Sequence, residues 1–211
     1  MLKILIADDH PVVREGLRHI LAGDSGKCIF DYCESYEEIL NKIEKNNYDL
    51  LFLEINLLGY KGLSAIEKIK KRANLAIIVL TLLPEELFAI RTLKNGASAF
   101  ISKGSPPGEL ILAFERVLAG KKYIGPGLAE KIADRLTVES DVTPEEKLSN
   151  REFQIMQMIA SGEELRNIAQ ELSLSPRTVS TYRKRILKKM NLKNNAALSV
   201  YAIKNKLIKE F

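Results

Sequence analysis

Three carboxylates, a hydroxyl and an ammonium group stand at or directly after the ends of short apolar runs in the first half of the sequence. They belong to Asp8, Asp9, Glu54, Thr81 and Lys103. Carboxylates packed together disfavour their own ionised forms, and a divalent cation would relieve that repulsion. Ligands that are all oxygens suit Mg²⁺. One such residue alone would mean little, but the five together predict a polar site that can hold Mg²⁺ beside a hydroxyl and an ammonium group.

The apolar runs that carry these side chains alternate with stretches whose apolar residues recur at helical spacing. The runs read KILIA, CIFDYC, DLLFLE, AIIVLT and SAFIS. Continuous apolar strands are expected where helices cover both faces of a parallel sheet. Residues 1–120 are therefore predicted to form a doubly wound α/β domain with a five-stranded parallel sheet. Ligands bind at the carboxyl ends of the strands in such a sheet, so the five side chains should converge on one edge.

The second part of the chain has a different pattern. Residues 121–147 contain glycines, prolines and mixed charges, and we expect a linker in which GLAEKIADRL could form a short helix. Residues 148–211 are helical in pattern throughout. Ser149 and Glu152 have the spacing of a capping box, and Ser175 precedes a proline, which favours another helix start. The sequence thus predicts a small all-α domain of four helices behind the α/β domain.

The net charge differs between the two parts. Residues 148–211 contain 12 Lys and Arg against 5 Asp and Glu, a net charge of +7, whereas residues 1–147 contain 20 against 22, a net charge of −2. A basic domain behind a slightly acidic one is the electrostatic footprint of a protein that binds a polyanion. A lysine-rich surface that is only solvated is the plain alternative.

The third helix of the basic domain, in LSPRTVSTYRKRILKKM, carries the candidate nucleic-acid contacts. Its apolar residues recur at helical spacing and should face the core: Val179, Tyr182, Ile186, Leu187 and Met190. The residues left to face outward are Arg177, Ser180, Thr181, Lys184, Arg185 and Lys188. A short helix, a tight turn and an exposed basic helix form a helix-turn-helix, whose second helix enters the major groove. The basic domain is therefore expected to bind double-stranded DNA.

Several classes of protein and site are not expected. No apolar run approaches the roughly 20 residues needed to cross a bilayer, and the start MLKILIADDH reaches two aspartates too soon for a secretory signal. We therefore expect a cytoplasmic protein with no membrane partner. Cys28 and Cys33 have an odd separation, which points them to opposite faces of a strand, so no disulfide between them is expected. Two histidines give no zinc constellation.

Motifs in both parts of the chain resemble those of a known family. ILIADDHPVVREGL, VLT and GASAFISKG resemble the acidic pair, the switch threonine, and the switch aromatic (Phe100) and lysine of a receiver domain. LSNREFQIMQMIASG and NIAQELSLSPRTVSTYRKRILKKMNL resemble a LuxR-type DNA-binding domain. The chain therefore resembles a two-component response regulator of the NarL/FixJ type over nearly its whole length. This implies a CheY-like receiver sheet with the strand order 2-1-3-4-5.

The resemblance assigns roles to particular residues. It implies that Mg²⁺ is held by Asp8, Asp9 and the backbone carbonyl of Asn56. It implies that a phosphoryl group is contacted by Thr81 and Lys103. In the basic domain it implies base contacts from Ser180, Thr181 and Lys184, and phosphate contacts from Arg177, Thr178, Arg185 and Lys188. It also implies that the last helix joins two copies through Ala196, Val200 and Ile203, so that a homodimer reads an operator with two half-sites.

One position departs from the family pattern in a way that affects mechanism. Where the family has Asp-Ile-Asn-Met-Pro-Gly, with the aspartate as phosphoacceptor, this chain has EINLLG, which begins at Glu54. The additional methylene moves the carboxylate by roughly 1.5 Å, and a misplacement of about 1 Å can cost on the order of 100-fold in rate. Glu54 could instead accept bonds from Lys103 and Thr81 without phosphate, as a partial mimic with a charge of about −1 against about −1.5 to −2. Leu58 replaces the family's proline, so the loop is expected to be held less firmly.

The sequence leaves three states of the receiver open. Glu54 could bias it toward an active form, the receiver could be inert to phosphate, or weak phosphorylation could survive. The first two are preferred, although the intact set of pocket residues favours the third. A sensor kinase partner stays undetermined.

Two other functions compete with that of a DNA-binding regulator. An interaction protein that sequesters a signalling partner is one. A phosphohydrolase is the other, but such enzymes carry a second carboxylate two residues after the first, whereas Asp8 and Asp9 are adjacent. We therefore expect no enzyme.

Overall fold

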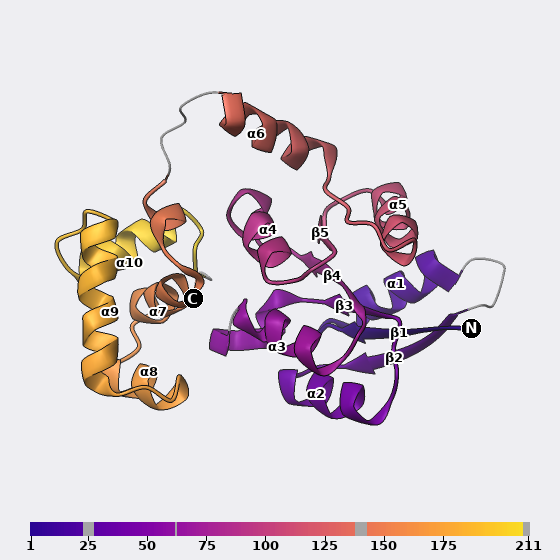
Figure 1. Cartoon of the computed structure of the whole chain (residues 1–211), viewed down its shortest axis with the longest axis horizontal. Helices are drawn as coiled ribbons and strands as arrows, with labels where there is room; N and C mark the ends of the chain where they lie inside the picture. Colours follow the sequence, from indigo (N-terminus) through magenta and orange to yellow (C-terminus); the bar gives the residue numbers. More distant parts are fainter. Residues whose placement is uncertain (23–27, 62, 138–142, 209–211) are drawn as a thin grey trace. The chain divides into compact units, whose positions relative to one another are not determined.

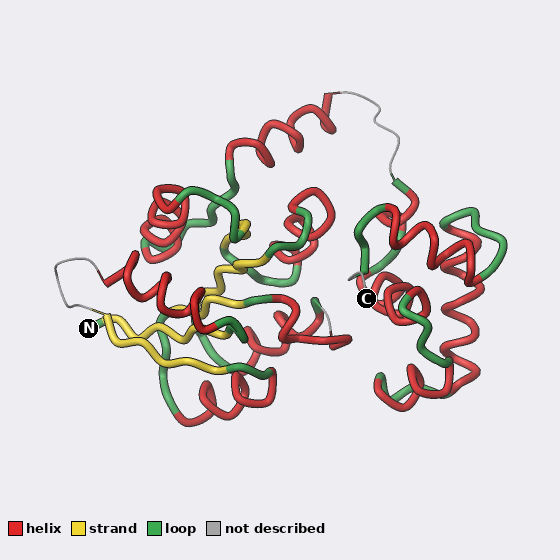
Figure 2. Tube along the Cα trace, turned by 180° about the vertical axis from the view of Figure 1, so that it is seen from behind, coloured by secondary structure: helices red, strands yellow, loops and turns green. Residues whose placement is uncertain are grey.

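The computed structural model of the protein describes residues 1–22, 28–61, 63–137 and 143–208. The chain divides into two compact units, Met1–Val138 and Glu139–Phe211. Figure 1 labels the helices and strands of both units, and Figure 2 shows the same elements from behind. No helix within the described ranges is long and apolar enough to span a membrane.

The first unit is built on a five-stranded parallel sheet with the order β2-β1-β3-β4-β5 (Figure 1). The strands are β1 (Leu2–Ala7), β2 (Cys28–Cys33), β3 (Leu50–Leu53), β4 (Ala76–Thr81) and β5 (Ala99–Ser102). Ala7 pairs with Leu53, so β1 and β3 end at the same level, and Thr81 pairs with Ser102, so β4 and β5 do as well. The predicted doubly wound sheet and its strand order are confirmed, and the order reverses beside β1 and β3.

Helices cover both faces of this sheet. They are α1 (Pro11–Ala22), α2 (Tyr36–Lys45), α3 (Ser64–Arg72), α4 (Glu85–Lys94) and α5 (Pro107–Leu118). Leu17 of α1 and Val117 of α5 pack with Ile4 in one core cluster, so these two helices share a face. Right-handed crossovers place α2, α3 and α4 on the other face. All four residues of β3 are buried because the strand is covered from both sides.

The loop that follows Glu54 is anchored by an apolar side chain. It forms the short 3₁₀ segment η2 (Ile55–Lys61), in which Gly59 has a φ of 51°. Leu58, which replaces the family's proline, is only 1% exposed. Burial of a leucine side chain contributes about 1.5–3 kcal/mol. Packing of Leu58 therefore fixes this loop in a way that was not expected from the absence of the proline.

The segment after α5 begins by extending the sheet. Tyr123 forms a parallel bridge with Ala99 of β5, and its N–H donates to the carbonyl oxygen of Ser98 at 2.9 Å. The Tyr123 side chain is buried in the same core cluster as α1 and α5. Helix α6 (Pro126–Thr137) follows. Residues at the start of the expected linker thus belong to the core of the first unit.

Over its described residues, 143–208, the second unit consists of a short 3₁₀ turn and four helices. These are η3 (Pro144–Lys147), α7 (Asn150–Ala160), α8 (Leu165–Glu171), α9 (Pro176–Lys189) and α10 (Asn195–Lys204). The predicted capping box of Ser149 and Glu152 opens α7, and the Ser175 hydroxyl accepts from the Thr178 N–H at the start of α9. A small core fills the space between the helices, with Phe153, Ile186 and Leu198 among its buried side chains.

Candidate functional site

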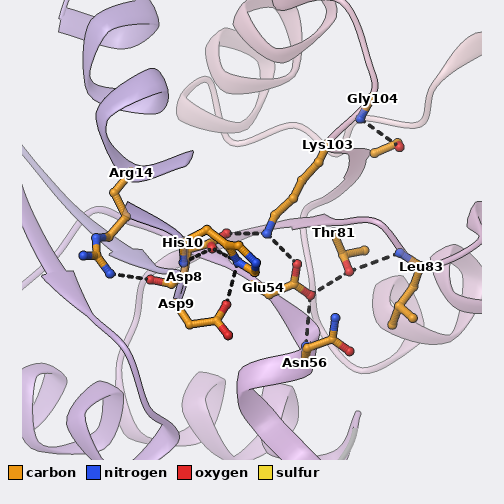
Figure 3. Close-up of polar contacts among 11 residues, drawn as sticks. Asp8, Asp9, His10, Arg14, Glu54, Asn56, Thr81, Leu83, Lys103 and Gly104 are labelled. Carbon is orange, nitrogen blue, oxygen red and sulfur yellow. Dashed lines mark hydrogen bonds and ion pairs between the residues drawn. The ribbon is translucent and has the colours of Figure 1, made fainter. Parts of the chain in front are cut away.

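Four of the five polar side chains singled out from the sequence lie together at the carboxyl edge of the sheet (Figure 3). Asp8 follows β1, Glu54 follows β3, Thr81 ends β4 and Lys103 follows β5. The backbone sets their positions, because the Glu54 N–H donates to Ala7 and the Lys103 N–H donates to Thr81, both at 2.9 Å. Parallel pairing therefore brings side chains from four strands to one place.

The Glu54 carboxylate contacts three of the hydrogen-bond donors in this pocket. Its side chain is 2% exposed, and its Oε2 lies 2.8 Å from Lys103 Nζ. Its Oε1 accepts from the Thr81 hydroxyl at 2.7 Å and from the Asn56 N–H at 3.0 Å. The two contacts expected from the sequence, to Lys103 and Thr81, are therefore both present. The third, from the backbone of Asn56, was not foreseen.

Lys103 also binds a second buried carboxylate. Its Nζ lies 2.7 Å from Asp8 Oδ2, and the Asp8 side chain is 3% exposed. Burial of the ammonium acts to lower the pKa of Lys103, but the hydrogen bonds to Asp8 and Glu54 outweigh it and raise that pKa above its ordinary value. The ammonium is thus held in its charged form between two carboxylates.

The rim of the pocket is formed by Asp9 and His10. Half of the Asp9 side chain is exposed, and its Oδ1 lies 2.8 Å from His10 Nδ1. The His10 N–H donates to Asp8 Oδ1 at 2.9 Å. Ligand atoms of Asp8, Asp9 and His10 all lie within 4.8 Å of one another. Sequence reasoning did not include His10, and only its position next to the acidic pair could have indicated it.

Phe100 lies outside this group of polar side chains. It is 2% exposed in the centre of β5. Its neighbours Ala99 and Ile101 point into the core cluster beneath α1 and α5. Because side chains alternate along a strand, Phe100 faces the opposite side of the sheet.

Helix α9 presents a basic face to solvent in the second unit. The exposed members of the expected set are Arg177, Thr181, Lys184, Arg185 and Lys188, while Ser180 and Thr178 are half-buried. The Thr178 hydroxyl lies 2.8 Å from the Ser175 hydroxyl at the helix start. Of the expected core face, Val179, Ile186 and Met190 are buried, and Tyr182 and Leu187 are half-buried. The amphipathic division of the helix is close to the expected one.

Two polar contacts fix α9 against its neighbours. Lys189 Nζ lies 2.6 Å from Glu152 Oε2 of α7, and the Glu152 side chain is 5% exposed. The Arg183 Nε donates to Asn195 Oδ1 of α10 at 2.6 Å. Lys189 binds the buried Glu152 carboxylate although 42% of its own side chain stays exposed, and Arg183 is half-buried. Sequence reasoning did not find these pairs.

Helix α10 carries apolar side chains on its exposed face. Ala196, Val200 and Ile203 are exposed, with Val200 at 67% and Ile203 at 44%. Leu198 and Ala202 of the same helix are fully buried. The Tyr201 hydroxyl donates to Glu145 Oε2 at 2.5 Å, which ties η3 to this helix. The residues singled out for dimerisation therefore form an apolar stripe at helical spacing.

A parallel sheet of this order with an acidic pocket at its carboxyl edge, followed by a helix-turn-helix unit, defines the architecture of a receiver joined to a DNA-binding domain. Residues 4–115 match the model of the response regulator receiver domain, and residues 146–202 match that of the LuxR family of bacterial regulatory proteins.

Whole proteins of the same arrangement are similar to this chain. Response regulator UvrY of Escherichia coli K12 is 33% identical over 209 residues, which cover 98% of this chain and 96% of UvrY. Response regulator GacA of Pseudomonas syringae pv. syringae is 31% identical over 210 residues, 99% of this chain and 98% of GacA. The structure of RcsB from Salmonella enterica serovar Typhimurium, bound to the promoter rprA with phosphomimetic BeF₃⁻, is 25% identical with a TM-score of 0.73, covering 95% of this chain and 98% of RcsB. The chain therefore belongs to the two-component response regulators of the NarL/FixJ type.

Proposed function

We propose that this protein is a DNA-binding transcriptional regulator whose receiver is held by Glu54 in a state that does not depend on phosphorylation. One observation carries the proposal: the buried Glu54 carboxylate already has Lys103 and Thr81 as hydrogen-bond donors. These are the residues that the family resemblance assigns to a phosphoryl group. The receiver thus has internally the contacts that a phosphorylated acceptor would make.

The same contacts oppose phosphorylation of Glu54. A carboxylate that attacks a phosphodonor must have a free oxygen in line with it. Oε1 of Glu54 accepts two hydrogen bonds, so an attack by Oε1 requires one of them to break, whereas Oε2 binds the ammonium and keeps one lone pair. A hydrogen bond to a charged group contributes about 1.5–3 kcal/mol. Loss of such a bond adds to the barrier.

The bias that Glu54 exerts on the receiver is limited by its charge. It carries about −1, against about −1.5 to −2 for a phosphoryl group. A shift from 1:99 to 99:1 between two states takes about 5.5 kcal/mol of differential binding. We expect a partial shift of about 1 kcal/mol from one carboxylate. The receiver is therefore constitutively biased toward its active form, and the amount of DNA binding also depends on the concentration of the regulator or on a partner protein.

The second unit supplies the DNA contacts in this proposal. Helix α9 follows the short α8 and exposes basic side chains along one face, which is the arrangement that enters a major groove. Base edges are contacted from Ser180, Thr181 and Lys184. Phosphates are contacted from Arg177, Thr178, Arg185 and Lys188. RcsB, which has the same arrangement, has been solved bound to promoter DNA.

The operator is proposed to have two half-sites read by a homodimer. The stripe of Ala196, Val200 and Ile203 on α10 offers an exposed apolar surface at helical spacing. A two-fold dimer buries the same stripe from both copies and spaces two copies of α9 for successive major grooves. Such a regulator acts on chromosomal DNA, and we infer a cytoplasmic location from that role.

The acidic pocket has a donor set of the class that Mg²⁺ prefers. Carboxylates of Asp8 and Asp9 and the carbonyl of Asn56 would hold the ion, and all of these ligands are oxygens. When bound, Mg²⁺ would neutralise negative charge beside Glu54. However, Asp8 Oδ2 and Glu54 Oε2 already share the ammonium of Lys103. The chain's own cation therefore offsets one of these two negative charges without the metal.

Other functions are distinguished from this one by simple measurements. A conventional regulator would be phosphorylated by a small phosphodonor or a sensor kinase, and the intact pocket residues are what favours it. An interaction protein that sequesters a partner would show no salt-dependent affinity for duplex DNA. An enzyme would turn over phosphate esters with Mg²⁺, which we do not expect.

The decisive experiment measures duplex DNA affinity on operators selected from random sequence. It compares the protein with Glu54→Asp and with Glu54→Gln, which keeps the size of the side chain and removes its charge. We expect tight binding by the unmodified protein, weaker binding by both variants, and recovery of Glu54→Asp alone on addition of a phosphodonor with Mg²⁺. Equal binding by all three proteins, unaffected by the donor, would show that Glu54 does not set the state of the receiver.

A further inference from the structure

The turn between α8 and α9 sets the direction in which α9 leaves the helix-turn-helix. Helix α8 ends at Glu171 and α9 begins at Pro176. Within the turn, the Leu174 N–H donates to the carbonyl oxygen of Ala169 at 2.8 Å. Ser173 has a φ of 53°, in the left-handed region. The turn thus has the form of a Schellman motif, in which the left-handed residue is usually glycine.

A serine in the left-handed region depends on its surroundings. A residue with a Cβ atom is strained there, and such a conformation persists where neighbouring contacts hold it in place. The Ser173 side chain is exposed, so its own packing does not supply that hold. A contact to the backbone of the turn can supply it instead.

Arg151 of α7 makes such a contact. Its Nη2 donates to the carbonyl oxygen of Leu172 at 3.0 Å, one residue before Ser173. Its Nη1 donates at 2.7 Å to Oε1 of the buried Gln154, so α7 fixes one side of the planar guanidinium while the other side reaches the turn. Leu172 is the C-cap of α8, where carbonyl oxygens lack partners within the helix and a positive charge is favourable.

We propose that Arg151 is a positioning residue of the DNA interface, which fixes the α8–α9 turn so that α9 meets the bases in one orientation. The residues that we assign to base contacts, Ser180, Thr181 and Lys184, all follow this turn on α9. A change in the direction of the helix at its start therefore moves all three together. The inference rests on the proposed function, because it concerns how α9 reads DNA.

The first measurement needs no DNA. Residue-resolved amide hydrogen exchange, followed by NMR, compares the full-length protein with Arg151→Met. We expect the Leu174 amide to exchange at least about tenfold faster in the variant, because the turn loses a bond from a charged donor. The Leu207 amide, which donates to the carbonyl oxygen of Ala202 at 2.8 Å in the turn after α10, should be unaffected.

Gln157→Met is the matched control. Gln157 is also a half-buried residue of α7, and its Nε2 donates to the carbonyl oxygen of Leu207 at 2.8 Å, directly after Lys206, which has a φ of 53°. This substitution should speed exchange of the Leu207 amide and leave that of Leu174 unchanged. Equal acceleration of both amides by both substitutions would indicate a general loosening of the second unit and would overturn the inference.

The second measurement is the ratio of the affinity for a selected operator to the affinity for a duplex of scrambled sequence, at one salt concentration. Loss of a positive charge lowers both affinities together, so the ratio reports base contacts rather than charge. We expect Arg151→Met to lower this ratio by on the order of tenfold, as for the loss of one base contact, and Gln157→Met by less than about twofold. An unchanged ratio in Arg151→Met would overturn the positioning role even if its turn exchanges faster.

Arg151→Lys replaces Arg151→Met if the methionine variant does not fold. Lysine keeps the charge but has no planar fork, so it cannot join Gln154 and Leu172 in the same geometry. A Leu174 exchange rate equal to that of the unmodified protein would then overturn the inference. Absence of salt-dependent duplex affinity in the unmodified protein would refute the proposed function, and the exchange of Leu174 would still decide whether Arg151 holds the turn.

Discussion

The hydrogen bond from Thr81 to Glu54 allows a quantitative test of the internal phosphoryl substitute. Thr81→Val removes the hydroxyl that donates to Glu54 Oε1 at 2.7 Å and keeps nearly the same shape. Thr81 is 0% exposed, so water cannot replace the donor. A hydrogen bond to a charged group contributes about 1.5–3 kcal/mol. Because Glu54 keeps Lys103 and the Asn56 N–H, we expect the free energy of unfolding of the first unit to fall by about 2 kcal/mol.

Thr92→Val is the matched control for this change. Thr92 is also 0% exposed, but its hydroxyl donates to the neutral carbonyl oxygen of Ala89 at 2.8 Å. Its loss should cost about 0.5–1.5 kcal/mol. Amide hydrogen exchange of β3 and β4, followed by mass spectrometry, measures the unfolding of the first unit separately from the second.

A double-mutant cycle with Glu54→Gln isolates the effect of charge. With a neutral acceptor at position 54, the cost of Thr81→Val should fall by about 1 kcal/mol or more, while the cost of Thr92→Val stays the same. Equal costs for Thr81→Val in both backgrounds would mean that Thr81 does not respond to the charge on Glu54. The proposal that Glu54 substitutes for a phosphoryl group would then be refuted.

Three further predictions concern the pocket, the basic helix and the exposed stripe. The pKa of Lys103 is raised, so its ammonium stabilises the fold as long as it stays charged. The difference in unfolding free energy between wild type and Lys103→Met should therefore be largest below the ordinary lysine pKa of 10.5 and disappear as the pH rises through the raised pKa. Urea denaturation followed by circular dichroism measures this difference. Lys189→Met should lower the unfolding free energy of the second unit by about 1–2 kcal/mol, a value already reduced for solvent screening because the Lys189 side chain is 42% exposed. The control Lys188→Met should change this free energy by less than about 0.5 kcal/mol. Burial acts to raise the pKa of Glu152, but the bonds from Lys189 and Ser149 outweigh it and lower that pKa below 4.5. The difference in unfolding free energy between wild type and Lys189→Met should therefore be largest above pH 4.5 and shrink as the pH falls through the lowered pKa. A difference that stays unchanged at low pH would contradict this. Val200→Asp should weaken self-association, measured by analytical sedimentation. The control is Val12→Asp, at a valine of the first unit that is 84% exposed, and it should leave self-association unchanged. Equal effects of the two substitutions would exclude the α10 stripe as the dimer surface.

The sequence predicted the parts of this structure that follow from periodicity. Apolar runs separated by helical patterns specify a parallel sheet covered on both faces, and four of the five side chains placed at strand ends lie together at its carboxyl edge, with Asp9 beside them. The bonds from Lys103 and Thr81 to Glu54 could be expected because the strands that carry them are neighbours or next neighbours in that sheet. The strand order that brings these side chains together was implied by the family resemblance and not by the periodicity of the sequence.

Contacts between distant residues without a repeating pattern could not be predicted. Tyr123 enters the core of the first unit, and Glu152 and Lys189 meet across 37 positions of sequence. Neither contact leaves a periodic signal, because each depends on how two elements pack once they have formed. Leu58 shows the same limit, since its burial depends on the space beneath the η2 loop and not on the residue type that it replaces.

The intact pocket can be explained without phosphorylation. Asp8 and Glu54 are both buried carboxylates, and without Lys103 they would repel each other in a medium that screens charge poorly. Thr81 is required on similar grounds, because a buried carboxylate oxygen that lacks a donor costs more than the bond itself contributes. The residues that would assist phosphoryl transfer in a relative with aspartate are therefore needed here as hydrogen-bond donors to the buried Glu54 side chain. Their presence is consequently no argument for a working phosphoacceptor. A substitution of Glu54 by an apolar residue leaves Lys103 paired with the buried Asp8, so Glu54→Leu should be less stable with Lys103→Met than without it, because the second change leaves Asp8 without a counter-ion.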